Sequence, residues 1–145
     1  MTRNRIGRAV LIFITLIFLV GCNYECNHPP RQLLENIQSV EIIDINSRRG
    51  INYEDVCNAK VLGTIDPECW TMVTNEIKEL PCSKHVMDPS LSFSGSVVRI
   101  RYKDGSMEFI SQGGIAVWDG YNWNCESHVV DEEVYTNFCD RIIGG

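Results

Sequence analysis

The chain has 145 residues, of which 44% are hydrophobic and 22% are charged, and its formal net charge is −6. An acidic chain of this kind is disfavoured as a nucleic-acid binder, because contacts to phosphate need clustered Lys and Arg side chains. The same charge disfavours unaided binding to anionic lipid, and the length suffices for one hydrophobic core but not for two.

The N-terminal 21 residues follow the three-part pattern of a secretory signal. Arg3, Arg5 and Arg8 come first without any acid, an apolar run follows over residues 9–20, and the small Gly21 ends it. An apolar run of this length covers about 18 Å as a helix, well short of the ~30 Å hydrocarbon core of a bilayer. We therefore expect residues 1–21 to be a signal peptide and not a membrane-spanning helix.

The stretch Leu19-Val20-Gly21-Cys22 resembles the lipobox of bacterial lipoproteins. In that family the thiol of the cysteine receives a diacylglycerol and a peptidase cleaves just before this residue. The resemblance implies that Cys22 is the lipid anchor, that cleavage separates Gly21 from Cys22, and that the protein is held at the cell membrane facing away from the cytoplasm. The alternative is an ordinary signal peptide followed by an unmodified cysteine.

The remaining chain divides into a lipidated cysteine with a short tether, residues 22–30, and a single globular domain, residues 31–145. Loss of residues 1–21 removes three arginines and no acid, so 13 − 3 = 10 positive charges face 19 negative ones, a net charge of −9. The tether contains Pro29-Pro30 and has no apolar periodicity. We therefore expect the domain to lie close to the bilayer.

An even number of cysteines remains once Cys22 is assigned to lipid, which favours disulfide bonds in an exported chain. Their spacing leaves every pairing open. There is no CxxC motif, so we expect neither a metal site nor another cofactor. The candidate disulfide cysteines are Cys26, Cys57, Cys69, Cys82, Cys125 and Cys139.

The first half of the domain predicts two strands and a helix. β-Branched residues indicate strands over 39–45 and 59–65, with a polar loop between them. A helix over 66–81 is predicted with Asp66 as its N-cap and Pro67 at its first position. Its apolar stripe consists of Trp70, Val73, Ile77 and Leu80.

The segment 96–111 predicts a β-hairpin around Asp104-Gly105, read as a two-residue type I′ loop. This register pairs Tyr102 with Met107 and Arg101 with Glu108. It places Arg99, Arg101 and Lys103 together on the polar face, a basic stripe that is a candidate site for an anionic group. A solvated sheet face of no special function is the alternative.

A second Asp-Gly pair, at residues 119 and 120, predicts another hairpin in which Trp118 faces Tyr121 and Ala116 faces Trp123. Trp118, Tyr121 and Trp123 are therefore candidate binding residues that could stack on the sugar rings of a glycan or anchor a protein partner. The alternative is that this aromatic face packs beneath a helix.

The chain ends in a predicted helix that Asp131 caps and Gly144 stops, with an apolar stripe of Val134, Tyr135, Phe138 and Ile142. The elements together predict an α+β domain of two layers, with an antiparallel sheet of five to six strands and both helices on one face.

No arrangement of residues specifies a reaction: there is no GxSxG, HExxH or Gly-rich phosphate loop. We therefore expect a binding or accessory module that is not an enzyme, with an envelope protein or a glycan as its ligand. The alternative function is a surface inhibitor that neutralises a basic hydrolase such as a lysozyme, for which the charge of the mature chain is suited.

Overall fold

A computed structural model of the chain describes residues 28–46, 53–81, 94–127 and 131–144. The predicted signal peptide, the Gly21-Cys22 cleavage site, Cys26 and Cys82 lie outside these residues. The elements in chain order are η1 (Leu34–Asn36), β1 (Ile37–Asn46), α2 (Tyr53–Cys57), β2 (Lys60–Ile65), η2 (Pro67–Cys69), α3 (Trp70–Glu79), β3 (Ser94–Tyr102), β4 (Met107–Ser111), β5 (Gly114–Trp118), β6 (Trp123–Ser127) and α4 (Glu132–Gly144).

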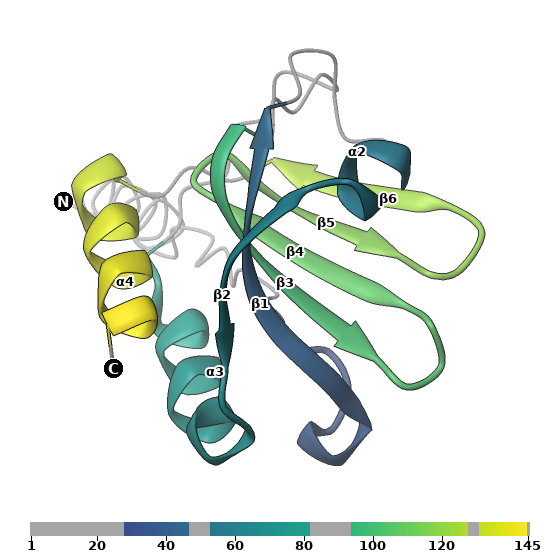
Figure 1. Cartoon of the computed structure of the whole chain (residues 1–145), viewed down its shortest axis with the longest axis horizontal. Coiled ribbons are helices and arrows are strands. Elements are labelled where there is room, and N and C mark those ends of the chain that lie inside the picture. The colour runs from purple at the N-terminus through teal and green to yellow at the C-terminus, as the bar shows by residue number, and fades with distance from the viewer. Residues whose placement is uncertain (1–27, 47–52, 82–93, 128–130, 145) are drawn as a thin grey trace, which may run out of the picture.

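The strands form one open antiparallel sheet in the order β2-β1-β3-β4-β5-β6. α3 and α4 lie side by side against one face, which we call the helix-covered face, and the short α2 packs on the opposite face, which we call the α2 face (Figure 1). The predicted fold class is thus confirmed: an α+β domain with both long helices on one face of a six-stranded sheet.

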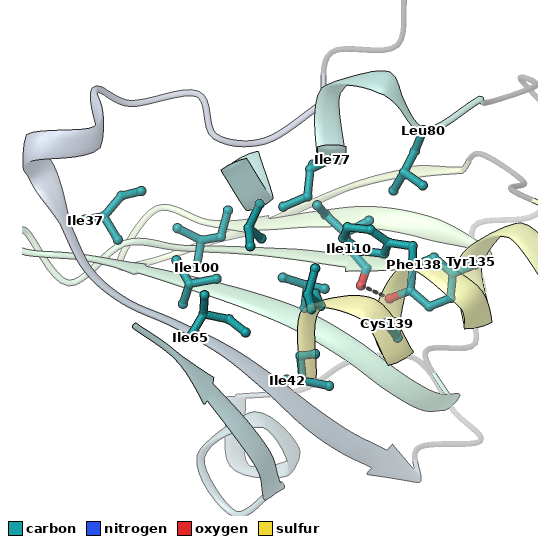
Figure 2. Close-up of a cluster of buried hydrophobic side chains, with 14 of the residues drawn as sticks. Ile37, Ile42, Ile65, Ile77, Leu80, Ile100, Ile110, Tyr135, Phe138 and Cys139 are labelled. Atoms are coloured by element: carbon teal, nitrogen blue, oxygen red, sulfur yellow. Dashed lines mark hydrogen bonds between the residues drawn. The ribbon is translucent and has the colours of Figure 1, made fainter. Parts of the chain in front are cut away.

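The main core lies between the helix-covered face and the two long helices (Figure 2). α3 contributes Val73 and Ile77, which lie one turn apart and are fully buried. α4 contributes Phe138, also fully buried, and Tyr135, whose hydroxyl lies 2.7 Å from the carbonyl oxygen of Ile110 and 3.0 Å from that of Ser96. α4 is therefore fixed to the sheet by packing and by a polar contact.

The predicted start of α4 is confirmed, and its predicted stripe is correct in three of four positions. Asp131 Oδ1 accepts hydrogen bonds from the amides of Glu133 and Val134, as an N-cap does. The predicted burial of Val134 is wrong, because its side chain is 40% exposed. The buried Cys139 completes the stripe instead. Tyr135, Phe138, Cys139 and Ile142 are spaced three, one and three residues apart, which keeps them on one side of the helix.

The first predicted helix divides into a 3₁₀ turn, η2, and α3. Asp66 occupies the N-cap position of η2, but its side chain makes no capping hydrogen bond. The indole of Trp70 instead donates to the carbonyl oxygen of Ile65, 3.0 Å away, and so joins the start of α3 to the end of β2.

The predicted register of the first hairpin is wrong by one residue. Arg101 pairs with Met107 and Ile100 pairs with Glu108. The loop has three residues: Gly105 N donates to Tyr102 O, Tyr102 N donates to Ser106 O, and Gly105 has φ of +86°. This is a type I turn followed by a glycine bulge, which accommodates Asp-Gly as readily as a type I′ turn does.

The register shift moves the side chains of β4 to opposite faces. Glu108 lies on the helix-covered face beside Tyr102, whereas Met107 and Phe109 lie on the α2 face. Every residue of β4 is buried, so the strand has no solvated face.

The second hairpin has a four-residue loop, and the predicted pairing of Trp118 with Tyr121 is wrong. Trp118 pairs with Trp123. Asp119 Oδ1 accepts hydrogen bonds from the amides of Tyr121 and Asn122, which closes the loop. The shift is two residues, so Trp118 and Trp123 still share a face as predicted.

The segment before η1 packs on the domain from His28 onward, although the sequence assigned residues 28–30 to the tether. Pro29 is buried, and a ring nitrogen of His28 lies 2.9 Å from the carbonyl oxygen of Leu80 at the end of α3. The backbone amide of Arg31 donates to Glu108 Oε2 at 3.1 Å. Residues 28–31 are therefore packed on the domain, although residues 28–30 were expected to belong to the tether.

Candidate functional site

The α2 face carries a row of side chains that crosses four neighbouring strands. Arg101 on β3 pairs with Met107 on β4, Met107 with Trp118 on β5, and Trp118 with Trp123 on β6. Directly paired residues of antiparallel strands share a face, so these four side chains lie side by side. We call them the arginine–tryptophan row. It joins the two sets of candidate residues that the sequence placed on separate hairpins.

Tyr53 of α2 extends the aromatic surface of the row. Its ring centroid lies 5.2 Å from that of Trp118, at an interplanar angle of 40°. The two indoles are 5.1 Å apart at 47°, and Phe109 packs 5.5 Å from Trp123 on the inner side. Trp118 and Trp123 are half-buried and Tyr53 is 50% exposed, so the rings rest on the second core cluster while part of each reaches solvent.

Beside the aromatic rings, two guanidinium groups share one carboxylate. Arg99 Nη2 lies 2.6 Å from Glu41 Oε2, and Arg101 Nε lies 3.4 Å from the same oxygen. Arg99 also donates to the carbonyl oxygen of Val56 at 2.9 Å, which holds α2 on the sheet. With two positive charges and one negative, this triad has a net charge of +1 in a chain whose total is −6.

The two arginines have different roles because their exposure differs. The side chain of Arg99 is 3% exposed, and burial lowers its pKa while Glu41 opposes that change. It cannot contact a ligand at the surface. The side chain of Arg101 is 34% exposed and uses only Nε for the ion pair with Glu41.

The row is rich in hydrogen-bond donors that no described residue uses. Within residues 28–46, 53–81, 94–127 and 131–144, the terminal nitrogens of Arg101 and the indole N–H groups of Trp118 and Trp123 have no acceptor. The hydroxyl of Tyr53 is close to Cys57, and their hydrogen bond raises the pKa of Tyr53. The arrangement offers positive charge, ring faces and N–H donors to one ligand.

Two of the predicted binding residues are not part of the row. Lys103 lies in the hairpin loop, and its Nζ donates to the carbonyl oxygen of Glu35 at 2.7 Å. Tyr121 lies in the other loop with its side chain 87% exposed. Both residues were predicted to lie with the others because the predicted hairpin loops are shorter than the loops that the chain forms.

Tyr53 and Glu41 belong to the site but were not identified from the sequence. Tyr53 lies in a stretch read as a polar loop, and an aromatic residue in such a stretch is the signal that could have marked it. Glu41 interrupts the apolar strand segment SVEIIDI, and a charge at that position needs a partner if the strand is covered on both faces.

The helix-covered face has a buried polar group of its own at Glu108, which is 2% exposed. It accepts hydrogen bonds from the hydroxyl of Tyr102 and the amide of Arg31, and the guanidinium of Arg31 lies 3.8 Å from Oε1. Burial raises the pKa of Glu108 against the effect of these donors, and burial together with Glu108 raises that of Tyr102. Because Glu108 and Tyr102 are buried, they have a structural role: they hold the N-terminal segment on the sheet.

Three candidate disulfide cysteines are described as free thiols: Cys57, Cys69 and Cys139. Cys57 belongs to α2, whereas Cys69 and Cys139 pack against the core on the other face of the sheet. Cys125 lies on β6, where its backbone pairs with Ala116. Disulfide bonding of the six cysteines stays a prediction.

Two hollows adjoin α4, away from the arginine–tryptophan row. One of about 300 Å³ lies between α4 and the start of β3, and one of about 190 Å³ lies between β2, α3 and α4. In the described part of the chain, no three His, Cys, Asp or Glu side chains are grouped as metal ligands. None of the helices in that part is both long and apolar enough to cross a bilayer.

The row is the one place in the described residues where stacking surfaces, donors and uncompensated charge meet. Comparisons with protein-family models, with curated proteins and with solved structures find no match to this chain.

Proposed function

We propose that this protein is a lipid-anchored binding module of the cell envelope, held at the membrane through Cys22 and facing away from the cytoplasm. The observation that carries the binding role is the arginine–tryptophan row: half-exposed indoles beside an arginine whose terminal nitrogens are unused. Half-buried aromatic side chains of this kind provide contact area at a small cost in conformational entropy. The anchor rests on the lipobox resemblance of residues 19–22.

The geometry of the row favours binding over catalysis. The titratable groups at this surface are Arg101 of the row and the adjoining Tyr53, and neither has a histidine or a second carboxylate beside it among the described contacts. General acid–base chemistry needs a group that exchanges protons near neutral pH. An arginine keeps its proton and serves as a fixed positive charge.

The anchor is tested on the full chain expressed in a bacterial host with a lipoprotein-processing pathway. We expect intact-mass spectrometry of the membrane fraction to show loss of residues 1–21 and a diacylglycerol on Cys22. The Cys22→Ala variant should lack both changes. A native protein with an unmodified Cys22, or with the leader attached, would refute the anchor.

The binding role is tested by sedimentation of the mature domain with detergent-washed envelope material. We expect the wild type to co-sediment and Tyr53→Ala to lose at least about tenfold in affinity, since a stacked aromatic ring contributes roughly 1–3 kcal/mol. Tyr121→Ala is the matched control, because Tyr121 is the more exposed tyrosine and lies outside the row. Equal losses in the two variants would refute the row as the binding surface.

The alternative function, inhibition of a basic hydrolase, is supported by the net charge of −9 and by no contact that the described residues make. An assay of lysozyme activity with micromolar mature domain separates the two functions. Inhibition that Tyr53→Ala leaves unchanged would favour the inhibitor over the binding module.

A further inference from the structure

From its charge and donors, we infer that the arginine–tryptophan row binds a carbohydrate that carries a carboxylate. This inference rests on the proposed binding role and names the chemical class of the ligand.

The charge of the triad selects an anion. Glu41 neutralises one of its two arginines, so one positive charge remains, and Arg101 is the arginine that reaches solvent. The terminal nitrogens of Arg101 are unused by the described residues, and a guanidinium presents such nitrogens as a pair that matches the two oxygens of a carboxylate. The exposed end of the triad is therefore a carboxylate site.

The rings next to Arg101 select a ligand with a stacking surface. Tyr53 and Trp123 are tilted by 40° and 47° from Trp118, so neighbouring rings do not form one continuous flat plane for a nucleobase or another flat ring system. A pyranose ring is puckered, and its C–H faces fit against surfaces that are inclined to each other. A polyphosphate carries several negative charges, whereas the triad leaves one positive charge to balance them.

The remaining donors fit the hydroxyl groups of a sugar. The indole N–H groups of Trp118 and Trp123 have no acceptor in the described residues, and neither nitrogen is a buried unsatisfied atom, so both are open to solvent and to a ligand. Sugar hydroxyl oxygens accept such bonds. Four strands at ~4.8 Å spacing make the row about 14 Å long, enough for more than one sugar ring.

The experiment uses two disaccharides that differ in the carboxylate. One is N-acetylglucosamine joined to N-acetylmuramic acid, which carries a lactyl carboxylate, and the other is chitobiose, which has none. Binding to the mature domain is followed by NMR through the three indole N–H signals. Trp70 is an internal control, because its indole is bonded to Ile65 O at the end of β2, outside the row.

We expect the acidic disaccharide to shift the signals of Trp118 and Trp123 but not that of Trp70, and to bind at least about tenfold more tightly than chitobiose. Arg101→Gln should abolish this preference without weakening the binding of chitobiose. Arg141→Gln is the matched control, because Arg141 pairs with Glu76 on the exposed side of the long helices. It should change neither affinity.

Two results would overturn the inference while leaving the proposed binding role in place. One is equal affinity for the two disaccharides at the row. The other is tighter binding of N-acetyl-glycyl-phenylalanine, which offers a carboxylate and a flat ring, than of the acidic disaccharide. A failure of the binding role itself would appear instead in the sedimentation experiment, as equal effects of Tyr53→Ala and Tyr121→Ala.

Discussion

Glu108 is a buried carboxylate, although the sequence predicted that its side chain would lie outside the core. The predicted register placed it on a polar face with Arg101, whereas it lies among the core residues and accepts hydrogen bonds from Tyr102 and Arg31. A buried carboxylate is tolerated when donors surround its oxygens. Arg31 is 77 positions away from Glu108 in the sequence, and Tyr102 is six positions away. No local sequence pattern could therefore reveal these donors.

The raised pKa of Glu108 gives the stability of the domain a specific pH dependence. A carboxyl group whose pKa is higher in the folded than in the unfolded chain stabilises the fold below its ordinary value of 4.5, and this contribution is lost as the pH rises through the folded pKa. Glu108→Gln cannot ionise. We expect the stability of the wild type relative to this variant to fall as the pH rises from 4 toward neutrality.

Urea unfolding at intervals between pH 4 and pH 8 measures this difference. Glu79→Gln, at an exposed position near the end of α3, is the control and should follow the wild type. Parallel profiles for the wild type and Glu108→Gln would contradict a raised pKa.

Arg99 shows how a short helix that the sequence did not predict changes the role of a residue. The sequence placed it in an exposed basic stripe with Arg101 and Lys103. Its side chain is instead buried between Glu41 and the carbonyl oxygen of Val56, while Arg101 alone reaches the surface of the site. The prediction of a basic group on this strand was useful, but the number of arginines available to a ligand depends on α2, which the sequence did not predict.

Among the elements, the loop of residues 103–105 determines which side chains form the site. Its three-residue length places Met107 and Trp118 in one row with Arg101. Gly105 adopts φ of +86°, a conformation that strains any residue with a Cβ, and apart from its chain neighbours no residue has an atom within 4 Å of the position that a Cβ would take. A substitution there changes backbone strain without adding a clash.

We expect Gly105→Ala to lower the free energy of unfolding by about 1 kcal/mol, the cost of a left-handed conformation for alanine. Gly105→Asn should cost less, because asparagine tolerates this region better. Thermal or urea unfolding of the two variants measures the order. A loop that had two residues in a type I′ turn would instead respond strongly at position 104 as well, since both residues of such a turn have positive φ.

The sequence predicted the long elements well because their patterns are strong. The helix over 66–81 and the C-terminal helix carry apolar residues at helical spacing, and both pack on the sheet through those residues, apart from Val134. The strands over 39–45 and 59–65 correspond closely to β1 and β2.

Register and the short elements were harder to predict, for a physical reason. β4 is buried on both faces, so the alternation of polar and apolar residues that normally fixes a register is missing there. α2 has five residues, and Val56 is its one buried side chain, so it has no apolar periodicity to detect. The candidate site includes residues of β4, whose register was predicted wrongly, and of α2, which was not predicted. The sequence therefore identified its residues as separate sets.

At the scale of the whole molecule, the packed N-terminal segment is part of the fold and not a linker. Pro29 is buried, His28 contacts the end of α3, and Arg31 contacts β4. Burial lowers the pKa of His28, while the bond to the Leu80 carbonyl raises it; burial has the larger effect, so the packed position favours the neutral imidazole.

Three chains that begin at Asn23, His28 and Leu33 test this boundary. We expect the first two to unfold with free energies within about 0.5 kcal/mol of each other, because both keep the buried Pro29 and the contacts of His28 with Leu80 and of Arg31 with Glu108. The third should lose about 2 kcal/mol or more, since it exposes apolar surface and removes the Arg31 donor from Glu108. Equal stability of all three chains in urea would show that residues 28–32 do not stabilise the domain, as expected of a tether over 22–30.

The packing of residues 28–31 on the domain also limits how far the protein could reach from the proposed anchor. Between an acylated Cys22 and His28 there are six Cα–Cα steps, a span of at most about 20 Å even when fully extended. An anchored copy could not follow a polymer into the outer wall. With the proposed anchor, it would sample only those polymer ends and strands that pass within a molecular diameter of the lipid headgroups, so a ligand of the proposed kind would have to be abundant in that thin layer.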